Sequence, residues 1–241
     1  MPLLDFGNRL NENGKNMQLE YARKMLNKAP SVIGLKNSRG AILVCLKPVI
    51  SSLHVLETEE KITKISEHCF MASTGIDPDC IFITSEMINV AKRYKKNFRE
   101  EISGEYLKLI LNNYLVTFNS NIGLRVLGAE FVYMKRENGQ YMLYHAENDG
   151  NIVKHRGVVI GSIKRRAKTE LEKLDLENMS LGQMVESAVK TFYKCYDPLV
   201  DKEFKLEIGV IGDETEGKYV RLSESDVQKY MEKYSDLSIE D

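Results

Sequence analysis

Hydrophobic and polar positions follow two different periods along this chain, and the two periods occur in separate blocks. Segments whose apolar side chains recur three and four positions apart predict amphipathic helices. These segments are residues 16–29, 77–98, 103–118, 163–174, 180–196 and 223–234. Shorter apolar runs bounded by glycine, proline or asparagine predict strands. These runs are residues 31–37, 41–47, 68–72, 126–135, 140–147, 151–160 and 203–211.

Capping and turn residues indicate where several of these elements begin and end. Asn16 and Ser103 stand where a side chain can cap a helix, and Ser180 begins a capping-box sequence. Pro30 is expected to stop the first helix, because proline cannot continue the hydrogen-bond ladder. The dipeptide Asn138-Gly139 is typical of a tight hairpin turn between two strands.

The order of the elements indicates the fold class. Helices grouped between blocks of hairpins lack the regular strand–helix alternation of a parallel sheet, so we expect an α+β fold in which antiparallel sheets are covered by helices. We see no internal repeat and no low-complexity linker, which predicts a single domain over residues 15–236. A polar, turn-rich segment precedes it at residues 1–14, and an acidic tail follows at residues 237–241.

Composition narrows the class of protein further. The 34 basic and 35 acidic residues give a net charge of −1, which offers no electrostatic reason to expect nucleic acid or a membrane as partner. The chain shows neither an apolar run long enough for a membrane span nor a secretory signal. We therefore expect a protein of the cytoplasm or nucleus.

The cysteines lack paired spacing and are expected to be buried thiols, with no metal or other cofactor. They are Cys45, Cys69, Cys80 and Cys195.

Other chemical signals along the chain are weak. No paired-histidine metal motif or glycine-rich phosphate loop is present, and His68 is interpreted as a structural histidine. Three aspartates are interpreted as cap or turn residues: Asp77, Asp79 and Asp149. A basic cluster could be a nuclear-import signal, but we favour a plain helix that presents these side chains to solvent. The cluster consists of Lys164, Arg165, Arg166 and Lys168.

One family signature lies in the first predicted helix. The string Gln18-Leu19-Glu20-Tyr21-Ala22, preceded by Asn13-Gly14-Lys15, resembles the signature of proteasome alpha-type subunits. The resemblance continues along the chain in AILVCLKPVISSL, EKITKISEH and the segment Leu124–Gly128, where valine replaces the proline of an R-P-x-G turn. The last third looks most like the alpha type 3 subunit, also called alpha seven. Together these motifs cover the chain from about Asn13 to Tyr234.

The resemblance implies a fold, partners and a role. The family fold is a four-layer α/β/β/α sandwich of two antiparallel sheets, like that of N-terminal-nucleophile hydrolases. Members form a heptameric ring with neighbouring alpha subunits of the 20S core, stack on beta-ring subunits, and receive the C-terminal tails of regulatory particles or activators. The implied role is ring assembly, substrate-entry gating and activator docking in ubiquitin-dependent protein degradation, in cytoplasm and nucleus.

Catalysis in this superfamily needs an N-terminal threonine whose own amine acts as base, with an aspartate and a lysine nearby. When the catalytic positions of the active subunits are aligned with the first predicted hairpin of this chain, the nucleophile corresponds to about Pro30. The acid corresponds to Leu46, six residues after Gly40. A lysine is retained at Lys61. We therefore expect a non-catalytic subunit. Two alternatives stay open: a processed, active hydrolase, which would begin at Thr, Ser or Cys, and a free-standing binding domain, which would purify as a monomer.

The resemblance assigns roles to three surface regions. Lys47 would line the activator pocket between adjacent subunits and pair with a terminal carboxylate; the alternative is an ordinary solvated lysine at a strand end. Ring contact through the N-terminal helix is assigned to Gln18, Glu20 and Tyr21, although the helix could pack only on its own domain.

The gate is assigned to the start of the chain, where the family usually has a Tyr-Asp pair. This chain has Leu3, Leu4, Asp5 and Phe6 instead, which removes the expected gate hydrogen bonds but leaves an obstructing tail. A disordered terminus without a role is the alternative. Arg125 and Gly128 are interpreted as structural turn residues.

Overall fold

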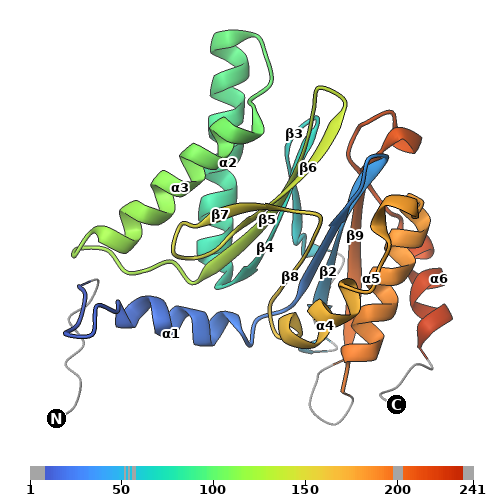
Figure 1. Ribbon diagram of the computed structural model, residues 1–241, viewed down its shortest axis with the longest axis horizontal. Helices are drawn as coiled ribbons and strands as arrows, with labels where there is room; N and C mark the ends of the chain where they lie inside the picture. Colours follow the sequence, from blue (N-terminus) through green and yellow to red (C-terminus); the bar gives the residue numbers. More distant parts are fainter. Residues whose placement is uncertain (1–8, 52, 54, 56–57, 198–202, 236–241) are drawn as a thin grey trace.

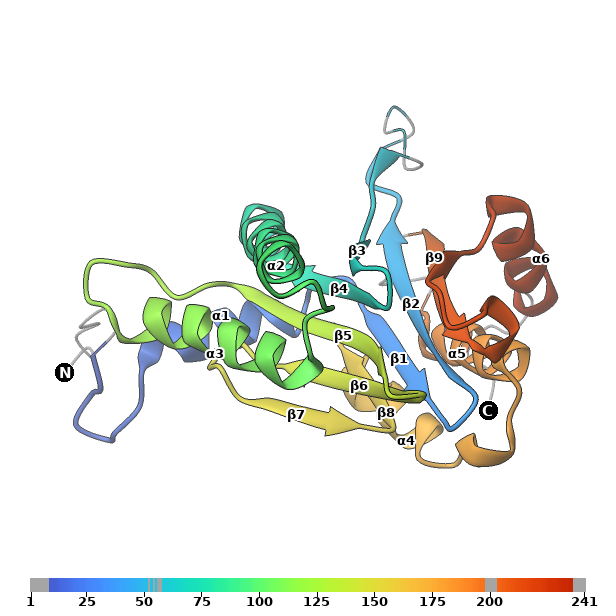
Figure 2. The same ribbon diagram turned by 90° about the horizontal axis from the view of Figure 1, so that it is seen from above.

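The computed structural model describes residues 9–51, 53, 55, 58–197 and 203–235. Two antiparallel sheets pack face to face, and helices cover the outer side of each (Figures 1 and 2). This arrangement confirms the expected α+β fold of four layers in the order α/β/β/α.

The helices are α1 (Met17–Leu26), α2 (Asp77–Phe98), α3 (Gly104–Ser120), α4 (Lys164–Leu171), α5 (Leu181–Cys195) and α6 (Glu224–Tyr234). Among the described residues each sheet has five strands. The first sheet runs in the order β10 (Val220–Arg221), β9 (Phe204–Gly212), β2 (Gly40–Pro48), β1 (Val32–Lys36) and β8 (Gly157–Ile160). The second runs in the order β3 (Ile62–Ser66), β4 (Cys69–Gly75), β5 (Ala129–Glu137), β6 (Gln140–Ala146) and β7 (Ile152–His155).

Three apolar layers hold the sandwich together. Strand β2 shows how alternation builds two of them: Ile42 and Val44 face α4, α5 and α6, whereas Leu43 and Cys45 face the second sheet. The third layer lies between the second sheet and the pair α2 and α3. Helix α1 belongs to none of the layers and runs along one end of the sandwich (Figure 1). The core therefore leaves the ends of the strands available for sites.

Local sequence signals are confirmed at most element boundaries. The Asn16 side chain accepts the backbone N–H groups of Gln18 and Leu19, and Ser103 caps α3. The capping box of Ser180 is formed at the start of α5. Asn138 and Gly139 have φ angles of 51° and 75°, as a tight hairpin turn between β5 and β6 requires.

Several elements differ from the sequence prediction. The run 151–160 is two strands, because the chain crosses at Arg156 from the second sheet to the first. Strands β3 and β10 were not predicted. Helix α1 ends at Leu26, before Pro30, because the residues that follow it bond elsewhere: the Ala29 carbonyl accepts the Ser162 N–H at 2.9 Å. Helix α4 likewise ends three residues early, at Leu171.

The cysteine prediction is confirmed within the described residues: all four thiols are free and buried. Burial raises the pKa of Cys69 to about 12 and that of Cys80 to about 11, so neither is an activated nucleophile. In the same part of the chain, none of the helices has both the length and the apolar character that crossing a bilayer requires. The proposed limits of the single domain, at residues 15 and 236, stay a prediction.

Candidate functional site

The structure brings together the three positions that correspond to the hydrolase active site. Pro30, Leu46 and Lys61 line one cavity of about 460 Å³ at the end of the sandwich beside α1. Pro30 sits between α1 and β1, and its carbonyl accepts a hydrogen bond from the Thr74 hydroxyl. The position of the attacking group is thus occupied by a proline, which has no hydroxyl and whose nitrogen is part of a peptide bond.

The retained lysine is held by two carboxylates. The Lys61 ammonium lies 2.6 Å from Glu59 and 2.9 Å from Asp77, which is the first residue of α2. Burial opposes the charge on Lys61, but the hydrogen bonds to Glu59 and Asp77 outweigh it and raise its pKa. Lys61 is therefore a firmly protonated cation that joins two segments of the fold, and it is poorly suited to accept a proton.

Other hydroxyl and thiol groups lie in or beside this cavity. Ser162 lines it, and its hydroxyl lies 3.2 Å from that of Ser31. Cys45 and Thr74 line a small adjoining void of about 10 Å³, which holds at most one water molecule. Burial raises the pKa of Cys45 well above its ordinary value of 9.0. The Thr74 hydroxyl already donates to Pro30. At the two positions where an active hydrolase would carry its nucleophile and its acid, this chain therefore has Pro30 and Leu46.

Lys47, the proposed docking residue, is buried at the end of β2. Its side chain is 5% exposed, and its ammonium donates to the Glu59 carbonyl at 2.7 Å. The nearest carboxylate oxygen of Glu207 lies 3.8 Å away. The interpretation of Lys47 as a solvated strand-end lysine is therefore wrong for this chain. Lys47 instead lines a pocket of about 320 Å³ bounded by β9, β10 and α6.

Glu207, on β9, is the residue that sequence reasoning missed. Its side chain is 1% exposed and accepts the backbone N–H groups of Lys61 at 2.9 Å and Ile62 at 3.2 Å. Arg221 approaches its other side, with Nε 3.6 Å from Oε1. The available signal was an acidic residue in the middle of the apolar run 203–211, since a buried carboxylate requires partners.

The predicted turn residues meet at the start of α2. Arg125 donates two hydrogen bonds to Asp79, at 2.7 and 2.5 Å, and the Gly128 N–H donates to the same carboxylate at 2.8 Å. Asp79 is buried although Arg125 is exposed. A side chain at Gly128 would meet the Met25 methyl group at 2.9 Å, so α1 packs directly on this turn. Asp79 is thus an ion-pair partner and not simply the cap residue that the sequence suggested.

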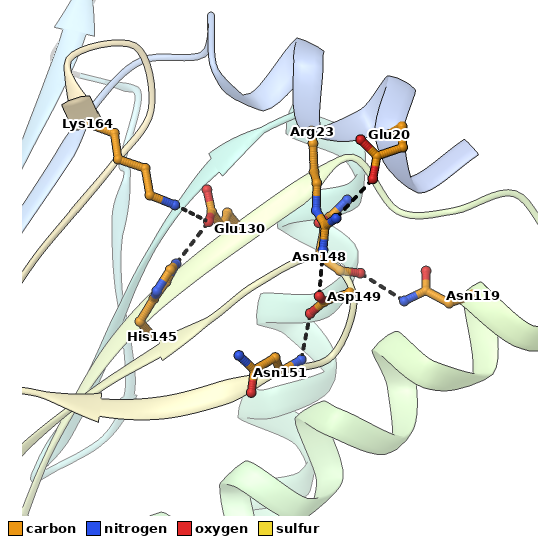
Figure 3. Close-up of polar contacts among 9 residues, drawn as sticks. All are labelled: Glu20, Arg23, Asn119, Glu130, His145, Asn148, Asp149, Asn151 and Lys164. Carbon is orange, nitrogen blue, oxygen red and sulfur yellow. Dashed lines mark hydrogen bonds and ion pairs between the residues drawn. The ribbon is translucent and has the colours of Figure 1, made fainter. Parts of the chain in front are cut away.

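Besides its packing on the turn at Gly128, helix α1 forms an ion pair with the rest of the chain through Arg23 (Figure 3). Arg23 reaches Asp149 at 2.6 Å, in the turn between β6 and β7, and Glu20 at 3.1 Å on its own helix. Asp149 also accepts the Asn151 N–H, which orders the turn. On α1 itself Tyr21 is 45% exposed. The helix therefore has one attached side and one aromatic side chain directed outward.

A second polar cluster lies deeper in the same region. Glu130 accepts from His145 at 2.9 Å and pairs with Lys164 at 3.4 Å (Figure 3). Burial opposes the Glu130 charge, but these partners outweigh it and lower the pKa of Glu130. Lys164 thus has an internal partner, while Arg165, Arg166 and Lys168 are exposed on α4. This placement agrees with the preferred interpretation of the basic cluster as a solvent-facing helix.

The four gate residues, Leu3, Leu4, Asp5 and Phe6, lie outside the described residues. Of the ring-contact residues on α1, Gln18 and Glu20 are half-buried in this chain and Tyr21 is exposed. The ring-contact group, the turn of Arg125 and Gly128, and Lys47 lie on different elements. Within the described residues, α1 packs on the turn of Gly128, whereas Lys47 lies in a different pocket, beside β9, β10 and α6.

Comparison with known proteins agrees with this geometry. The family model "Proteasome subunit" matches residues 26–211. The chain is 34% identical over 241 residues to a probable proteasome subunit alpha type-7 of Encephalitozoon cuniculi, with 100% of both chains covered. It is 29% identical over 229 residues to proteasome subunit alpha type-3 of Acanthamoeba castellanii, covering 95% of this chain and 90% of that protein. It is also 29% identical to a probable alpha type-7 subunit of Schizosaccharomyces pombe, over 88% of this chain and 84% of that protein.

The predicted family is confirmed by these matches and by the sandwich fold. Membership implies assembly with other proteasome subunits. The relatives are alpha-type subunits, which are non-catalytic, in agreement with Pro30 and Leu46 at the positions of nucleophile and acid. The chain belongs to the proteasome subunit family, as a non-catalytic alpha-type subunit of the 20S core.

Proposed function

We propose that this chain serves as a structural, gating and activator-docking subunit of the alpha ring, in ubiquitin-dependent protein degradation in cytoplasm and nucleus. Its partners would be neighbouring alpha subunits of a heptameric ring, subunits of the beta ring, and the C-terminal tails of regulatory particles or activators. The observation that carries the proposal is an intact hydrolase sandwich with Pro30 and Leu46 where nucleophile and acid belong. A sandwich without a nucleophile acts through the surfaces that it offers to neighbours.

The helix pair α2 and α3 supports the contact with a second ring. Large apolar side chains on this pair are exposed to solvent in the single chain, and a neighbouring protein could cover them. They are Ile81, Phe82, Phe98, Leu109 and Val116. The connection between α2 and α3 lies at the end of this pair that points away from α1 (Figure 1). If the N-terminal segment lies at the entrance, this end of the pair points toward the interior of the particle, where the beta ring would lie.

The outward side of α1 supports lateral contact within the alpha ring. Arg23 joins α1 to the turn at Asp149, so one side of the helix is bound to its own chain. Of the proposed contact residues, Tyr21 is exposed and Gln18 is half-buried, while Glu20 is half-buried and pairs with Arg23. An aromatic side chain with a polar tip is a common contact at protein interfaces.

The pocket beside Lys47 supports docking of a peptide carboxylate. Its lining has an apolar part that includes Leu206, Ile208 and Met231. Three basic residues, Lys47, Lys205 and Arg221, stand against two acidic ones, Glu207 and Glu224. This leaves a net positive charge next to an apolar surface, which is complementary to a chain end with apolar side chains and a free carboxylate.

For the gate we propose that residues 1–14, with Leu3, Leu4, Asp5 and Phe6, act as an obstructing tail at the entrance. The contacts of Arg125 and Gly128 with Asp79 support a structural role for that turn, because they join it to α2 and α1. A turn held in this way would give the N-terminal segment a fixed starting point.

Two experiments test the proposal. A tagged chain isolated from its own cells should be recovered within a large particle that contains other alpha and beta subunits; recovery as a monomer would favour the free-standing binding domain. On that particle, Lys47→Ala should weaken activator docking. Unchanged docking would remove Lys47 from the proposed role without affecting ring membership.

A further inference from the structure

The pocket proposed to receive a carboxylate already contains one. Glu207 is buried on β9 with its carboxylate 3.8 Å from the Lys47 ammonium and 3.6 Å from Arg221 Nε. Docking of a peptide terminus does not require an acidic group at this place, and like charges repel strongly where water is scarce. The position of Glu207 therefore needs an explanation of its own.

Glu207 cannot easily move away when a ligand arrives. Two backbone N–H groups, of Lys61 and Ile62, donate to its two oxygens and connect β9 to the start of β3. The side chain is 1% exposed and forms part of the pocket wall, so these two bonds hold it in place there. An incoming carboxylate that reaches Lys47 must therefore share the lysine with a fixed negative charge.

In the empty pocket Glu207 has the opposite effect. A buried ammonium without a counter-charge is costly, and Lys47 is 5% exposed. Glu207 supplies that counter-charge, together with the Glu59 carbonyl that accepts a hydrogen bond from Lys47 at 2.7 Å. The same carboxylate thus stabilises the lysine before docking and competes for it during docking.

We propose that Glu207 sets an upper limit on the affinity of this pocket, which keeps activator docking reversible. This inference rests on the proposed docking role of Lys47. In this account Lys47 is the attractive contact, Glu207 is the positioning and attenuating residue behind it, and Arg221 offsets part of the Glu207 charge from the other side. The preferred ligand is a peptide chain end with a free carboxylate.

The inference predicts that removing the negative charge of Glu207 increases the affinity of the pocket for a peptide with a free C-terminus. Glu207→Gln keeps the shape of the side chain and one oxygen acceptor but removes the negative charge. The probe is a fluorescent peptide with apolar residues near a free C-terminus, titrated onto intact particles that carry the variant, beside the same peptide ending in an amide. We expect Glu207→Gln to tighten binding of the free acid on the order of tenfold. Binding of the amide should not change.

A double-variant cycle ties the gain to the lysine. In a Lys47→Ala background, Glu207→Gln should give no gain, because the attraction that Glu207 attenuates is already gone. Glu216→Gln serves as the matched control, since Glu216 is an exposed acid outside the pocket with a side chain 83% exposed. It should leave the affinity unchanged.

The outcomes separate this inference from the proposed function. If Lys47→Ala leaves binding unchanged, the docking role itself fails. If Lys47→Ala weakens binding but Glu207→Gln weakens it or leaves it unchanged, Glu207 only supports the fold and the inference is overturned. Should Glu207→Gln fail to assemble, Arg221→Gln is compared in the natural and Lys47→Ala backgrounds. If Arg221 acts by offsetting the Glu207 charge on Lys47, its effect on binding of the free acid should vanish in the Lys47→Ala background; an equal loss in both backgrounds would overturn the inference.

Discussion

Removal of the Asp79 carboxylate should destabilise the chain far more than removal of its neighbour Asp77. Both residues lie in the first turn of α2, where a negative charge interacts favourably with the helix N-terminus. They differ in burial, because the side chain of Asp79 is 5% exposed and that of Asp77 is 65% exposed. Comparing substitutions of Asp79 and Asp77 therefore separates the effect of a buried tertiary contact from the effect of a negative charge at the helix N-terminus.

The magnitude follows from the three hydrogen bonds to Asp79. Asp79→Ala leaves the buried Gly128 N–H without its acceptor, at a cost of about 1–3 kcal/mol. The two bonds from Arg125 add only about 1 kcal/mol, because that guanidinium is 60% exposed and regains water on release. The total is about 2–4 kcal/mol. Asp77→Ala loses an exposed pair with Lys61 and a helix-end interaction, together about 0.5–1 kcal/mol.

Thermal unfolding followed by far-ultraviolet circular dichroism provides the assay, since the chain has no tryptophan for fluorescence. For a chain of this size, 1 kcal/mol corresponds to roughly 2–4 °C in Tm. We expect Asp79→Ala to lower Tm by several degrees more than Asp77→Ala. Equal shifts would refute the reasoning, because they would assign the effect of both carboxylates to the helix N-terminus and none to the turn at Arg125 and Gly128.

The remaining predictions concern catalysis, pH and docking. Pro30→Thr combined with Leu46→Asp should yield no peptidase activity in an uncleaved chain, since the threonine would lack a free amine; measurable hydrolysis by the purified variant would contradict this. The pKa of Glu130 is lowered from its ordinary value of 4.5, so its contribution to stability is present above about pH 4.5 and is lost as pH falls through the lower folded value. Glu130→Gln should flatten that acid limb of an unfolding curve, and an unchanged limb would argue against it. Lys47→Ala should weaken binding of a free C-terminal peptide but not of its amide; equal weakening of both would point to lost packing.

Much of this fold could be predicted because its signals are local. Helix caps at Asn16 and Ser103, the capping box of Ser180 and the Asn138-Gly139 turn depend on residues within a few positions of one another. The run 151–160 was misread because both halves contain β-branched apolar residues, such as Ile152 and Val158, and periodicity does not reveal that the chain changes sheets at Arg156.

The site was harder to predict because its contacts join distant parts of the chain. That Pro30, Leu46 and Lys61 meet was expected only from the family resemblance. The burial of Lys47 and its proximity to Glu207 depend on the pairing of β2 with β9, which no local pattern specifies. Where function depends on charges from different strands, the sequence supplies the residues but the sheet register decides which ones meet.

Native mass spectrometry of the tagged chain, isolated from its own cells, tests the central claim most directly. A non-catalytic ring subunit should appear in a multi-subunit particle and, when released from it, should have a mass that includes α1 and Pro30. A chain that runs as a monomer, or one cleaved so that a Thr, Ser or Cys becomes its first residue, would contradict the account.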